Sequence, residues 1–148
     1  MMTKIYCDIA DLKTIKLLSN KSLISGFTTN PSLMRLAGAK NYKNYSIKIL
    51  NACKKKPVSL EVFADNLKDM LKQAHEINSW GKNVYVKIPV VNSKGVFTGP
   101  VIKELSNKGM KLNITAVYTF EQTKKIYKIL NKKTKSIISI FAGRMADK

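Results

Sequence analysis

The chain has 148 residues, enough to bury a hydrophobic core and consistent with a single domain spanning residues 1–148. Its composition, 45% hydrophobic and 24% charged, is typical of a globular protein, and the sequence contains no apolar run of the roughly 18 residues that a membrane span needs. The N-terminus lacks the apolar core of a signal peptide, and two cysteines, Cys7 and Cys53, indicate reduced thiols rather than a disulfide framework. We therefore expect a cytoplasmic protein without a membrane segment.

The charge is strongly unbalanced, with 27 basic and 9 acidic residues and a formal net charge of +18. Only Arg35 and Arg144 are arginines, and the lysines are scattered along the whole chain. Specific nucleic-acid readers rely on arginine and on aromatic stacking platforms, so we expect a solvated lysine surface and no specific nucleic-acid partner. A positive field would also steer phosphorylated ligands toward a cleft. Nonspecific polyanion binding is the alternative interpretation of this charge.

Short β-rich runs alternate with helical stretches along the chain. Strands are predicted at residues 4–7, 25–28, 58–62, 83–88, 111–115 and 136–141. Segments with a 3.6-residue period lie between them at 11–18, 42–53, 66–77, 100–107 and 120–130. Asn30 followed by proline predicts a further helix start, Asp65 is a predicted cap for the helix at 66–77, and Gly81 and Gly109 are helix stop signals.

Six strand–helix steps of about 20–35 residues each predict a parallel sheet in an α/β protein. Such a sheet is either an open, doubly wound one or part of a (β/α)8 barrel. The glycine fingerprints G-x-G-x-x-G and G-x-x-x-x-G-K-[ST] are absent, which disfavours the open, nucleotide-binding alternative.

Each predicted strand carries polar or ionisable residues near its C-terminal end, whereas parallel strands buried on both faces are normally apolar throughout. In chain order these residues are Asp8, Thr28 with Asn30, Glu61, Lys87, Asn113 with Thr115, and Ser139 with Phe141. Side chains two residues apart in a strand share a face, and the C-terminal ends of barrel strands converge on one site. We therefore expect these residues, together with Arg144, to line one pocket.

Several of these residues also have a structural interpretation. Asp8 and Asn30 are suited to capping the helices that follow them, although capping by Asn30 is compatible with ligand binding. Glu61 and Lys87 lie on neighbouring strands and would form a structural ion pair, but a buried pair is expensive and contributes little stability. The single histidine, His75, lies in a predicted helix beside a glutamate and is expected to be a solvated surface residue without a role.

Five segments, in order and over essentially the whole chain, resemble the transaldolase family. They are Tyr-Cys-Asp-Ile-Ala-Asp at 6–11, Gly-Phe-Thr-Thr-Asn-Pro-Ser-Leu at 26–33, Val-Tyr-Val-Lys-Ile-Pro at 84–89, Leu-Asn-Ile-Thr-Ala-Val at 112–117 and Ser-Ile-Phe-Ala-Gly-Arg at 139–144. The resemblance implies a (β/α)8 TIM barrel, with about six of the eight β/α units present in this chain. It also implies a transaldolase of the class I aldolase type, which transfers a dihydroxyacetone unit between sugar phosphates in the pentose phosphate pathway without a metal or cofactor.

The resemblance assigns roles to the polar residues one by one. Lys87 matches the lysine that forms the Schiff base with a ketose phosphate, and Asp8 matches the acid/base that takes the hydroxyl proton during carbon–carbon cleavage. Glu61 and Thr115 match the residues that hold the catalytic water. The remaining matches are substrate-binding positions: Thr28, Asn30, Asn113, Ser139, Phe141 and Arg144, of which Asn30 and Asn113 would bind the dihydroxyacetone part and Arg144 the phosphate.

Two positions discriminate within the family. The smaller fructose-6-phosphate aldolases resemble this chain but have glutamine at the position of Glu61 and tyrosine at that of Phe141. We therefore favour group transfer, with a fructose-6-phosphate aldolase-like activity as the alternative.

The chain ends soon after the sixth predicted strand, whereas a (β/α)8 barrel ordinarily needs about 200 residues or more. An open six-stranded sheet would expose its two edges, which favours association, and we expect a homo-oligomer. Three explanations are open: a fragment of a full transaldolase, a barrel completed by another chain, or an autonomous and inactive or altered six-stranded variant. We favour the first.

Overall fold

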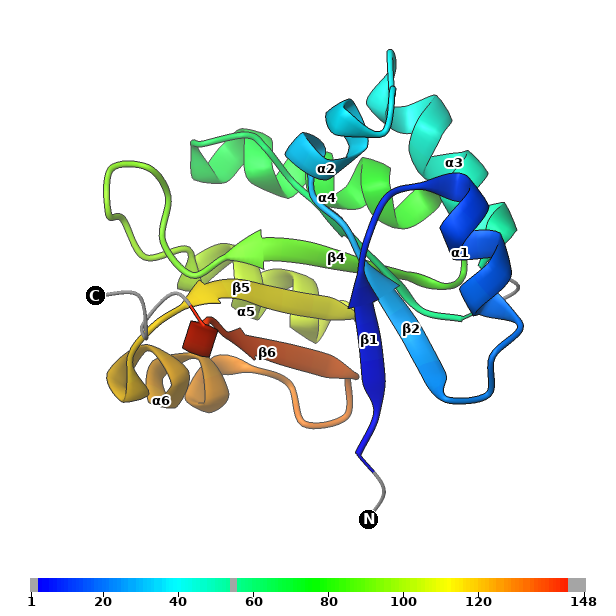
Figure 1. Cartoon of the computed structure of the whole chain (residues 1–148). Coiled ribbons are helices and arrows are strands. Elements are labelled where there is room, and N and C mark those ends of the chain that lie inside the picture. The colour runs from blue at the N-terminus through cyan, green and yellow to red at the C-terminus, as the bar shows by residue number, and fades with distance from the viewer. Residues whose placement is uncertain (1–2, 54–55, 144–148) are drawn as a thin grey trace. The chain divides into compact units, whose positions relative to one another are not determined.

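The computed structural model describes residues 3–53 and 56–143 and consists of alternating strands and helices (Figure 1). The strands are β1 (Ile5–Asp8), β2 (Ile24–Thr28), β3 (Val58–Glu61), β4 (Val84–Pro89), β5 (Leu112–Val117) and β6 (Ser136–Ile140). The helices are α1 (Leu12–Ser19), α2 (Pro31–Leu36), α3 (Tyr42–Ala52), α4 (Leu67–Ser79), α5 (Gly99–Asn107) and α6 (Phe120–Ile129). Every predicted strand and helix is confirmed, with boundaries that differ by no more than two residues.

The strand order settles the choice between the two α/β architectures. The sheet has the order β1-β2-β3-β4-β5-β6, so that neighbours in the sheet are neighbours in the sequence. The registers between β1 and β2, β2 and β3, β4 and β5, and β5 and β6 are all parallel. A doubly wound sheet reverses its strand order at a switch point, and this order has no reversal. The fold is therefore the singly wound β/α succession of a (β/α)8 barrel, with six strands present.

The chain forms two compact units, each with its own core. Unit 1 comprises residues 1–61 and 76–85, and contains β1, β2 and β3 with α1, α2 and α3. Its helices α1 and α3 pack together, and its largest fully buried side chains are Ile15, Phe27, Met34, Ile49, Leu60 and Ile77. The prediction of a single domain over residues 1–148 stays a prediction.

Unit 2 comprises residues 62–75 and 86–148, and contains β5 and β6 with most of β4, and the helices α5 and α6. Its core consists of Met70, Ile88, Ile102, Leu105, Leu112 and Ile114, all fully buried. Strand β6 is only partly covered along its length, in contrast to β5. Within residues 3–53 and 56–143, no helix combines the length and the apolar character required to cross a membrane.

Helix caps correct two details of the sequence analysis. Asp11, not Asp8, caps α1 by accepting a 2.8 Å hydrogen bond from the Thr14 backbone N–H. Asn66, not Asp65, caps α4, because its side-chain oxygen accepts from the Asp69 N–H at 2.9 Å. In both cases the cap is a nearby aspartate or asparagine, whose side-chain oxygen can accept the same hydrogen bond.

Asp65 instead fixes the loop between β4 and α5. Its carboxylate accepts hydrogen bonds from the Ser93 N–H and hydroxyl, both at 2.8 Å, and these bonds lower the pKa of the carboxyl group. Within the loop, Asn92 accepts from the N–H groups of Lys94 and Val96, and an isolated bridge joins Val91 to Phe97. The loop that follows β4 is therefore ordered by hydrogen bonds within it and by those from Asp65.

Candidate active site

The C-terminal ends of β1 and β2 bring two of the expected site residues into contact. Asp8 and Thr28 are register partners on these parallel strands, and the Thr28 hydroxyl donates a 2.8 Å hydrogen bond to an Asp8 carboxylate oxygen. Asp8 is exposed, so the carboxylate keeps access to solvent and to a ligand. Thr28 therefore orients Asp8, a role that the sequence analysis did not assign.

Asn30 lies two residues beyond β2 and caps α2. Its side-chain oxygen accepts a 2.9 Å hydrogen bond from the Leu33 N–H, and Pro31 occupies the first turn of the helix. The predicted capping role is thus confirmed. Because the side-chain oxygen accepts a hydrogen bond from the helix, a ligand would bind the side-chain NH2 group as its donor.

Two tyrosines of α3 donate hydrogen bonds to backbone carbonyls near the C-terminal ends of β1, α2 and β3. The Tyr42 hydroxyl donates a 2.9 Å hydrogen bond to the backbone oxygen of Glu61, the last residue of β3. The Tyr45 hydroxyl reaches the carbonyl oxygens of Ala10 at 3.0 Å and Ala37 at 3.2 Å. Burial raises the pKa of Tyr42, so its hydroxyl remains a neutral donor. The sequence analysis predicted the helix at 42–53 but not these hydrogen bonds of its tyrosines.

Lys87 lies in the middle of β4 and is buried, with only 7% of its surface exposed. Its register partner on β5 is Asn113, which is also buried. Register partners on adjacent parallel strands point their side chains to the same face of the sheet, so the amine and the amide share one environment. A lysine side chain buried to this extent is rare, because transferring an ammonium group out of water costs free energy.

Asn113 is held by a residue of the next strand. The Ser139 hydroxyl on β6 donates a 2.7 Å hydrogen bond to the side-chain oxygen of Asn113. The sequence analysis expected these two residues in one pocket, and the structure brings them together. The bond fixes the amide so that its nitrogen, the donor end, points away from Ser139.

Thr115 lies two residues beyond Asn113 and has a buried hydroxyl without a hydrogen-bond partner within the described residues. The next residue, Ala116, has a left-handed backbone with φ of 55°, and the register between β5 and β6 shifts between Ile114 and Val117. This combination is a β-bulge at the C-terminal end of β5, a feature that occurs frequently beside active sites. The sequence analysis did not predict this bulge.

The last expected residues follow β6. The Phe141 N–H donates a 2.9 Å hydrogen bond to the Val117 carbonyl oxygen, and its ring makes an edge contact with Tyr118 at a centroid distance of 5.6 Å. Tyr118 was missed by the sequence analysis. Arg144, the predicted phosphate ligand, lies outside the described residues.

The expected site residues are divided between the two units. Unit 1 holds Asp8 with Thr28, and separately Asn30 and Glu61, while unit 2 holds Lys87, Asn113, Thr115, Ser139 and Phe141. The group in unit 2 combines a buried amine with amide and hydroxyl groups, which suits covalent chemistry at a carbonyl carbon. His75 is exposed, as expected. Between residues 3 and 143, except for 54 and 55, there is no cluster of three or more His, Cys, Asp or Glu side chains that could hold a metal ion.

A family model described as Transaldolase/Fructose-6-phosphate aldolase matches residues 5–148. Among curated proteins, a probable transaldolase of Dehalococcoides mccartyi is 33% identical, with 97% of this chain and 63% of the relative covered. A probable transaldolase of Methanococcus maripaludis is 34% identical, with 97% and 62% covered, and one of Streptococcus agalactiae is 32% identical, with the same coverage. The chain thus spans about three fifths of the length of the curated relatives that it matches.

Among solved structures, the orotidine 5'-phosphate decarboxylase of Thermotoga maritima is similar, with a TM-score of 0.51 and 19% sequence identity. The match covers 92% of this chain and 64% of that chain. At this identity the likeness concerns the fold alone, and it agrees with the β/α succession described above.

Proposed function

Because the chain belongs to the transaldolase/fructose-6-phosphate aldolase family, we propose that it transfers a dihydroxyacetone unit between sugar phosphates through a Schiff base on Lys87. The burial of Lys87 is the single observation that carries the proposal. Its register partner on β5 is the neutral Asn113, which is also buried.

The proposed reaction begins with the neutral amine of Lys87, which attacks the ketone carbon of a ketose phosphate. The adduct takes up a proton and loses water to give an iminium ion. The bond between the α and β carbons of the iminium ion then breaks, and the iminium accepts its electron pair. The hydroxyl on the β carbon gives its proton to Asp8 and becomes the aldehyde of an aldose phosphate, which leaves, and an enamine remains on Lys87. Attack of the enamine on the aldehyde of an acceptor sugar, followed by hydrolysis of the imine, completes the transfer.

The other residues have supporting parts in the proposal. Glu61 and Thr115 hold the water that is expelled and later attacks the imine, and the unpartnered Thr115 hydroxyl supports this role because it offers a buried position for one hydrogen-bond partner. Asn113, fixed by Ser139, binds the dihydroxyacetone hydroxyls. Thr28, Asn30 and Phe141 also contact the substrate, and Arg144 binds its phosphate.

The proposal includes a setting for the activity: the pentose phosphate pathway in the cytoplasm, with the chain acting as a homo-oligomer. The two cysteines are both free thiols, as in proteins of a reducing compartment. The alternative activity, simple aldol cleavage of fructose 6-phosphate, is disfavoured because residues 61 and 141 are Glu and Phe.

Borohydride trapping tests the proposal directly. The 148-residue chain is incubated with fructose 6-phosphate and sodium borohydride, and the labelled peptide is identified by mass spectrometry. We expect a reduced dihydroxyacetone adduct on Lys87, none in Lys87→Ala, and an unchanged adduct in Lys111→Ala, which removes a half-buried lysine just before β5.

A folded chain that gives no adduct on Lys87 would overturn the proposal for this protein. A second measurement separates the two activities, because a transaldolase passes the three-carbon unit to erythrose 4-phosphate, whereas an aldolase releases free dihydroxyacetone. Release of dihydroxyacetone at the same rate with and without the acceptor would establish the alternative.

A further inference from the structure

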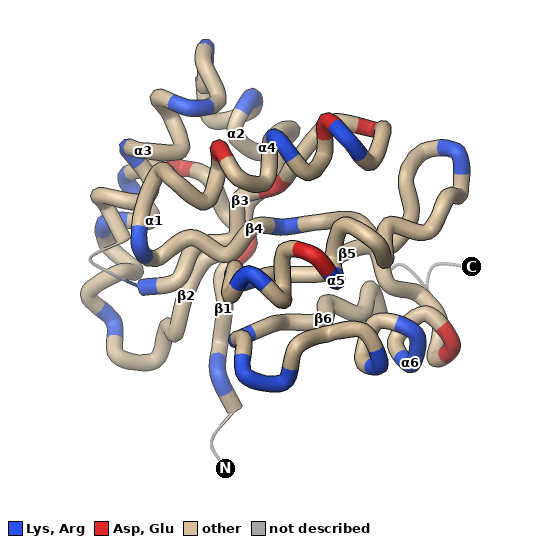
Figure 2. The backbone as a smooth tube through the Cα atoms, turned by 180° about the vertical axis from the view of Figure 1, so that it is seen from behind, with Lys and Arg blue, Asp and Glu red and all other residues tan. Residues whose placement is uncertain are grey.

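A band of lysines on α6 and the turn after it has no part in the proposed reaction. Six lysines fall between residues 124 and 135 with no acidic residue among them: Lys124, Lys125, Lys128, Lys132, Lys133 and Lys135. All six are exposed, and none pairs with a carboxylate in the part of the chain that the structure describes. Figure 2 shows the basic positions recurring along α6 and through the turn into β6. We call these six residues the lysine band.

The turn that carries half of the lysine band is ordered. Its Asn131 N–H donates a 2.8 Å hydrogen bond to the Ser106 hydroxyl on α5, and the Thr134 hydroxyl donates to the Ser106 carbonyl oxygen at 2.8 Å. Within the turn, the Lys133 N–H donates to the Asn131 side chain at 2.9 Å. The backbone positions of the lysines are thus fixed by a buried serine rather than left to vary.

The fold holds like charges close together at one end of the lysine band. Lys111 lies just before β5, where the Leu112 N–H bonds to the Lys135 carbonyl. Burial lowers the pKa of Lys111, and the charge of Lys135 lowers it further. Elsewhere in unit 2, Lys72 pairs with Asp69 at 3.6 Å and Lys108 with Glu104 at 2.7 Å. The lysine band is therefore a local excess of positive charge that an external polyanion would relieve.

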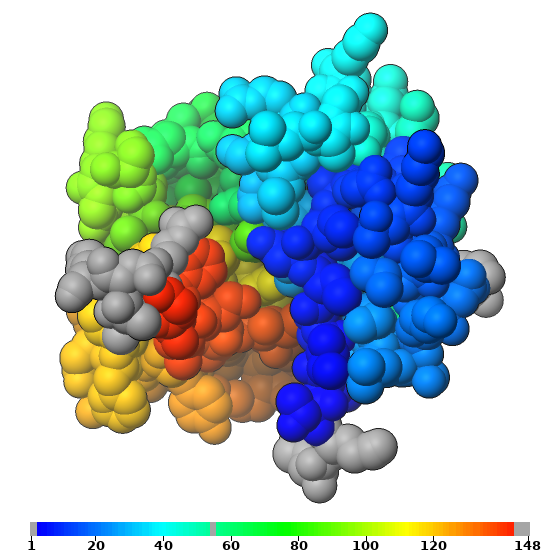
Figure 3. Space-filling view, viewed as in Figure 1, coloured from blue at the N-terminus to red at the C-terminus, as the bar shows by residue number. Residues whose placement is uncertain are grey.

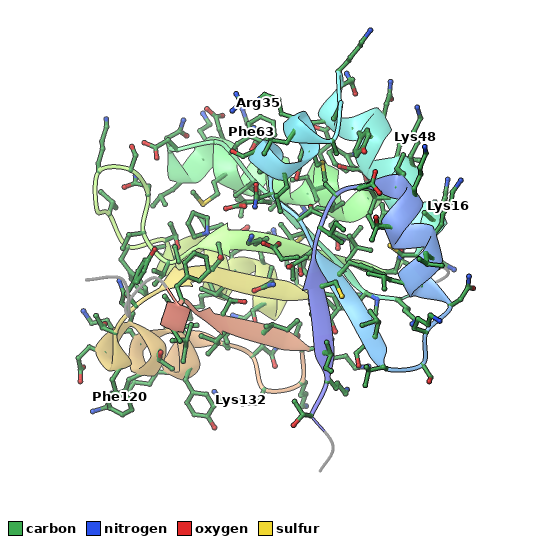
Figure 4. All side chains as sticks on the ribbon, viewed as in Figure 1. Lys16, Arg35, Lys48, Phe63, Phe120 and Lys132 are labelled. Atoms are coloured by element: carbon green, nitrogen blue, oxygen red, sulfur yellow. The ribbon has the colours of Figure 1, made fainter. Side chains whose placement is uncertain are left out.

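Two exposed aromatic rings are interleaved with the lysine band. Phe120 and Tyr127 are 76% and 62% exposed, and they lie on one face of α6 with Lys124 between them. Lys132 places its ammonium group 3.2 Å from the centre of the Tyr127 ring. Figure 4 shows the Phe120 side chain projecting away from α6, and Figure 3 shows α6 and its turn, coloured yellow to orange, as a continuous part of the surface.

We propose that the lysine band with Phe120 is a binding site for single-stranded nucleic acid, in which the lysines contact phosphates and Phe120 stacks on a base. Lysine point charges bind phosphates without reading sequence, and an exposed ring accepts any base. This site differs from the sequence-specific reader that the scarcity of arginine disfavours.

An anionic lipid surface is the less suitable partner. A helix that lies in a membrane interface buries a broad apolar face in the lipid. The apolar face of α6 is already used within the protein, since Ile126 is fully buried, and Phe120 and Tyr127 are the large apolar side chains that this helix exposes. The charge continues beyond the helix into the turn, which fits an extended strand.

The test measures fluorescence anisotropy of labelled single-stranded oligothymidylate with the full chain at several salt concentrations. We expect the affinity to fall with salt at a logarithmic slope of about −0.7 per phosphate contacted, hence roughly −4 for the lysine band. The variant Lys124→Gln, Lys128→Gln, Lys133→Gln should bind about tenfold or more weakly, with a slope reduced by about 2.

The matched control removes the same charge from unit 1, in Lys16→Gln, Lys40→Gln, Lys48→Gln. These three lysines are exposed, and Figure 4 shows Lys16 and Lys48 on α1 and α3. The control should retain affinity to within about threefold, because its three lysines are not part of the lysine band. Equal losses in the two triple variants would overturn the proposal, since attraction would then follow net charge alone.

The single variant Phe120→Ala tests the stacking. We expect about fivefold or greater loss of affinity with an unchanged salt slope, since a stacking contact carries no counterions. No loss in Phe120→Ala, or binding to phosphatidylserine vesicles without binding to the oligonucleotide, would overturn the proposal. Lys87→Ala should bind as tightly as the unaltered chain, so this result is separate from the fate of the proposed enzymatic function.

Discussion

The Ser139 hydroxyl on β6 donates to the side-chain oxygen of Asn113 on β5, and the bond of 2.7 Å joins two residues of the proposed site across adjacent strands. Asn113 is only 1% exposed, so water cannot replace Ser139 as the donor. The bond therefore serves both the stability of unit 2 and the orientation of the amide that lies beside Lys87 in the sheet register.

Replacing Ser139 by alanine should destabilise the protein by about 1–2 kcal/mol, because it removes a hydrogen bond to the side chain of the buried Asn113. Ser136→Ala is the matched control on the same strand, since the Ser136 hydroxyl is buried without a partner within the described residues. The control should be neutral or slightly stabilising. Urea unfolding of both variants measures the difference, and equal free energies of unfolding would contradict the structural role of the bond.

Replacing Thr115 by valine should separate stability from function. The two side chains have the same shape, and valine removes a buried hydroxyl without a hydrogen-bond partner in the described part of the chain, so we expect a gain of about 1 kcal/mol in the free energy of unfolding. If the hydroxyl holds the reacting water, the rate of imine formation should fall at the same time, whereas Thr115→Ser should retain it. A valine variant that loses stability would show that the hydroxyl has a structural partner.

Much of the fold could be predicted from the sequence, because it depends on local patterns. Apolar runs with turn residues between them predicted all six strands, and polar residues at the strand ends marked the candidate site. The contact between Asn113 and Ser139 agrees with the expected convergence of polar residues at the C-terminal ends of the strands.

What the sequence did not predict depends on contacts between distant segments. The hydroxyls of Tyr42 and Tyr45 donate to backbone carbonyls far along the chain, whereas periodicity predicted only the helix that carries them. Asp65 looked like a cap, but its partner is Ser93, 28 residues away. The bulge at Ala116 arises from the register between β5 and β6, which no local preference of alanine would suggest.

Replacing Ala116 by glycine should stabilise the protein. Ala116 has φ of 55°, a left-handed conformation that costs a residue with a side chain about 1–2 kcal/mol. Glycine removes this strain but gives the unfolded chain more entropy, so we expect a net gain of about 0.5–1 kcal/mol in urea unfolding. Ala74→Gly, inside α4, is the control and should destabilise by about 1 kcal/mol or more. Loss of stability in both variants would show that the bulge is not strained.

The two cysteines should differ in reactivity with iodoacetamide. Cys53 is fully buried at the end of α3, and burial raises the pKa of its thiol to about 12, whereas Cys7 on β1 is partly exposed. At pH 8 the thiolate fraction of Cys53 would be about 10⁻⁴, so Cys7 should be modified first and Cys53 only after unfolding. Intact mass spectrometry of Cys7→Ser, in buffer and in urea, measures this difference.

The same shift predicts the effect of pH on stability. The folded state keeps the Cys53 proton more tightly than the unfolded state, whose thiol has the ordinary pKa of 9.0. The contribution of Cys53 is therefore fully present below pH 9 and is lost as pH rises toward about 12. Cys53→Ala should flatten this decline in the free energy of unfolding.

Labelling of Cys7→Ser at equal rates in buffer and in urea would show instead that Cys53 is accessible in the folded protein.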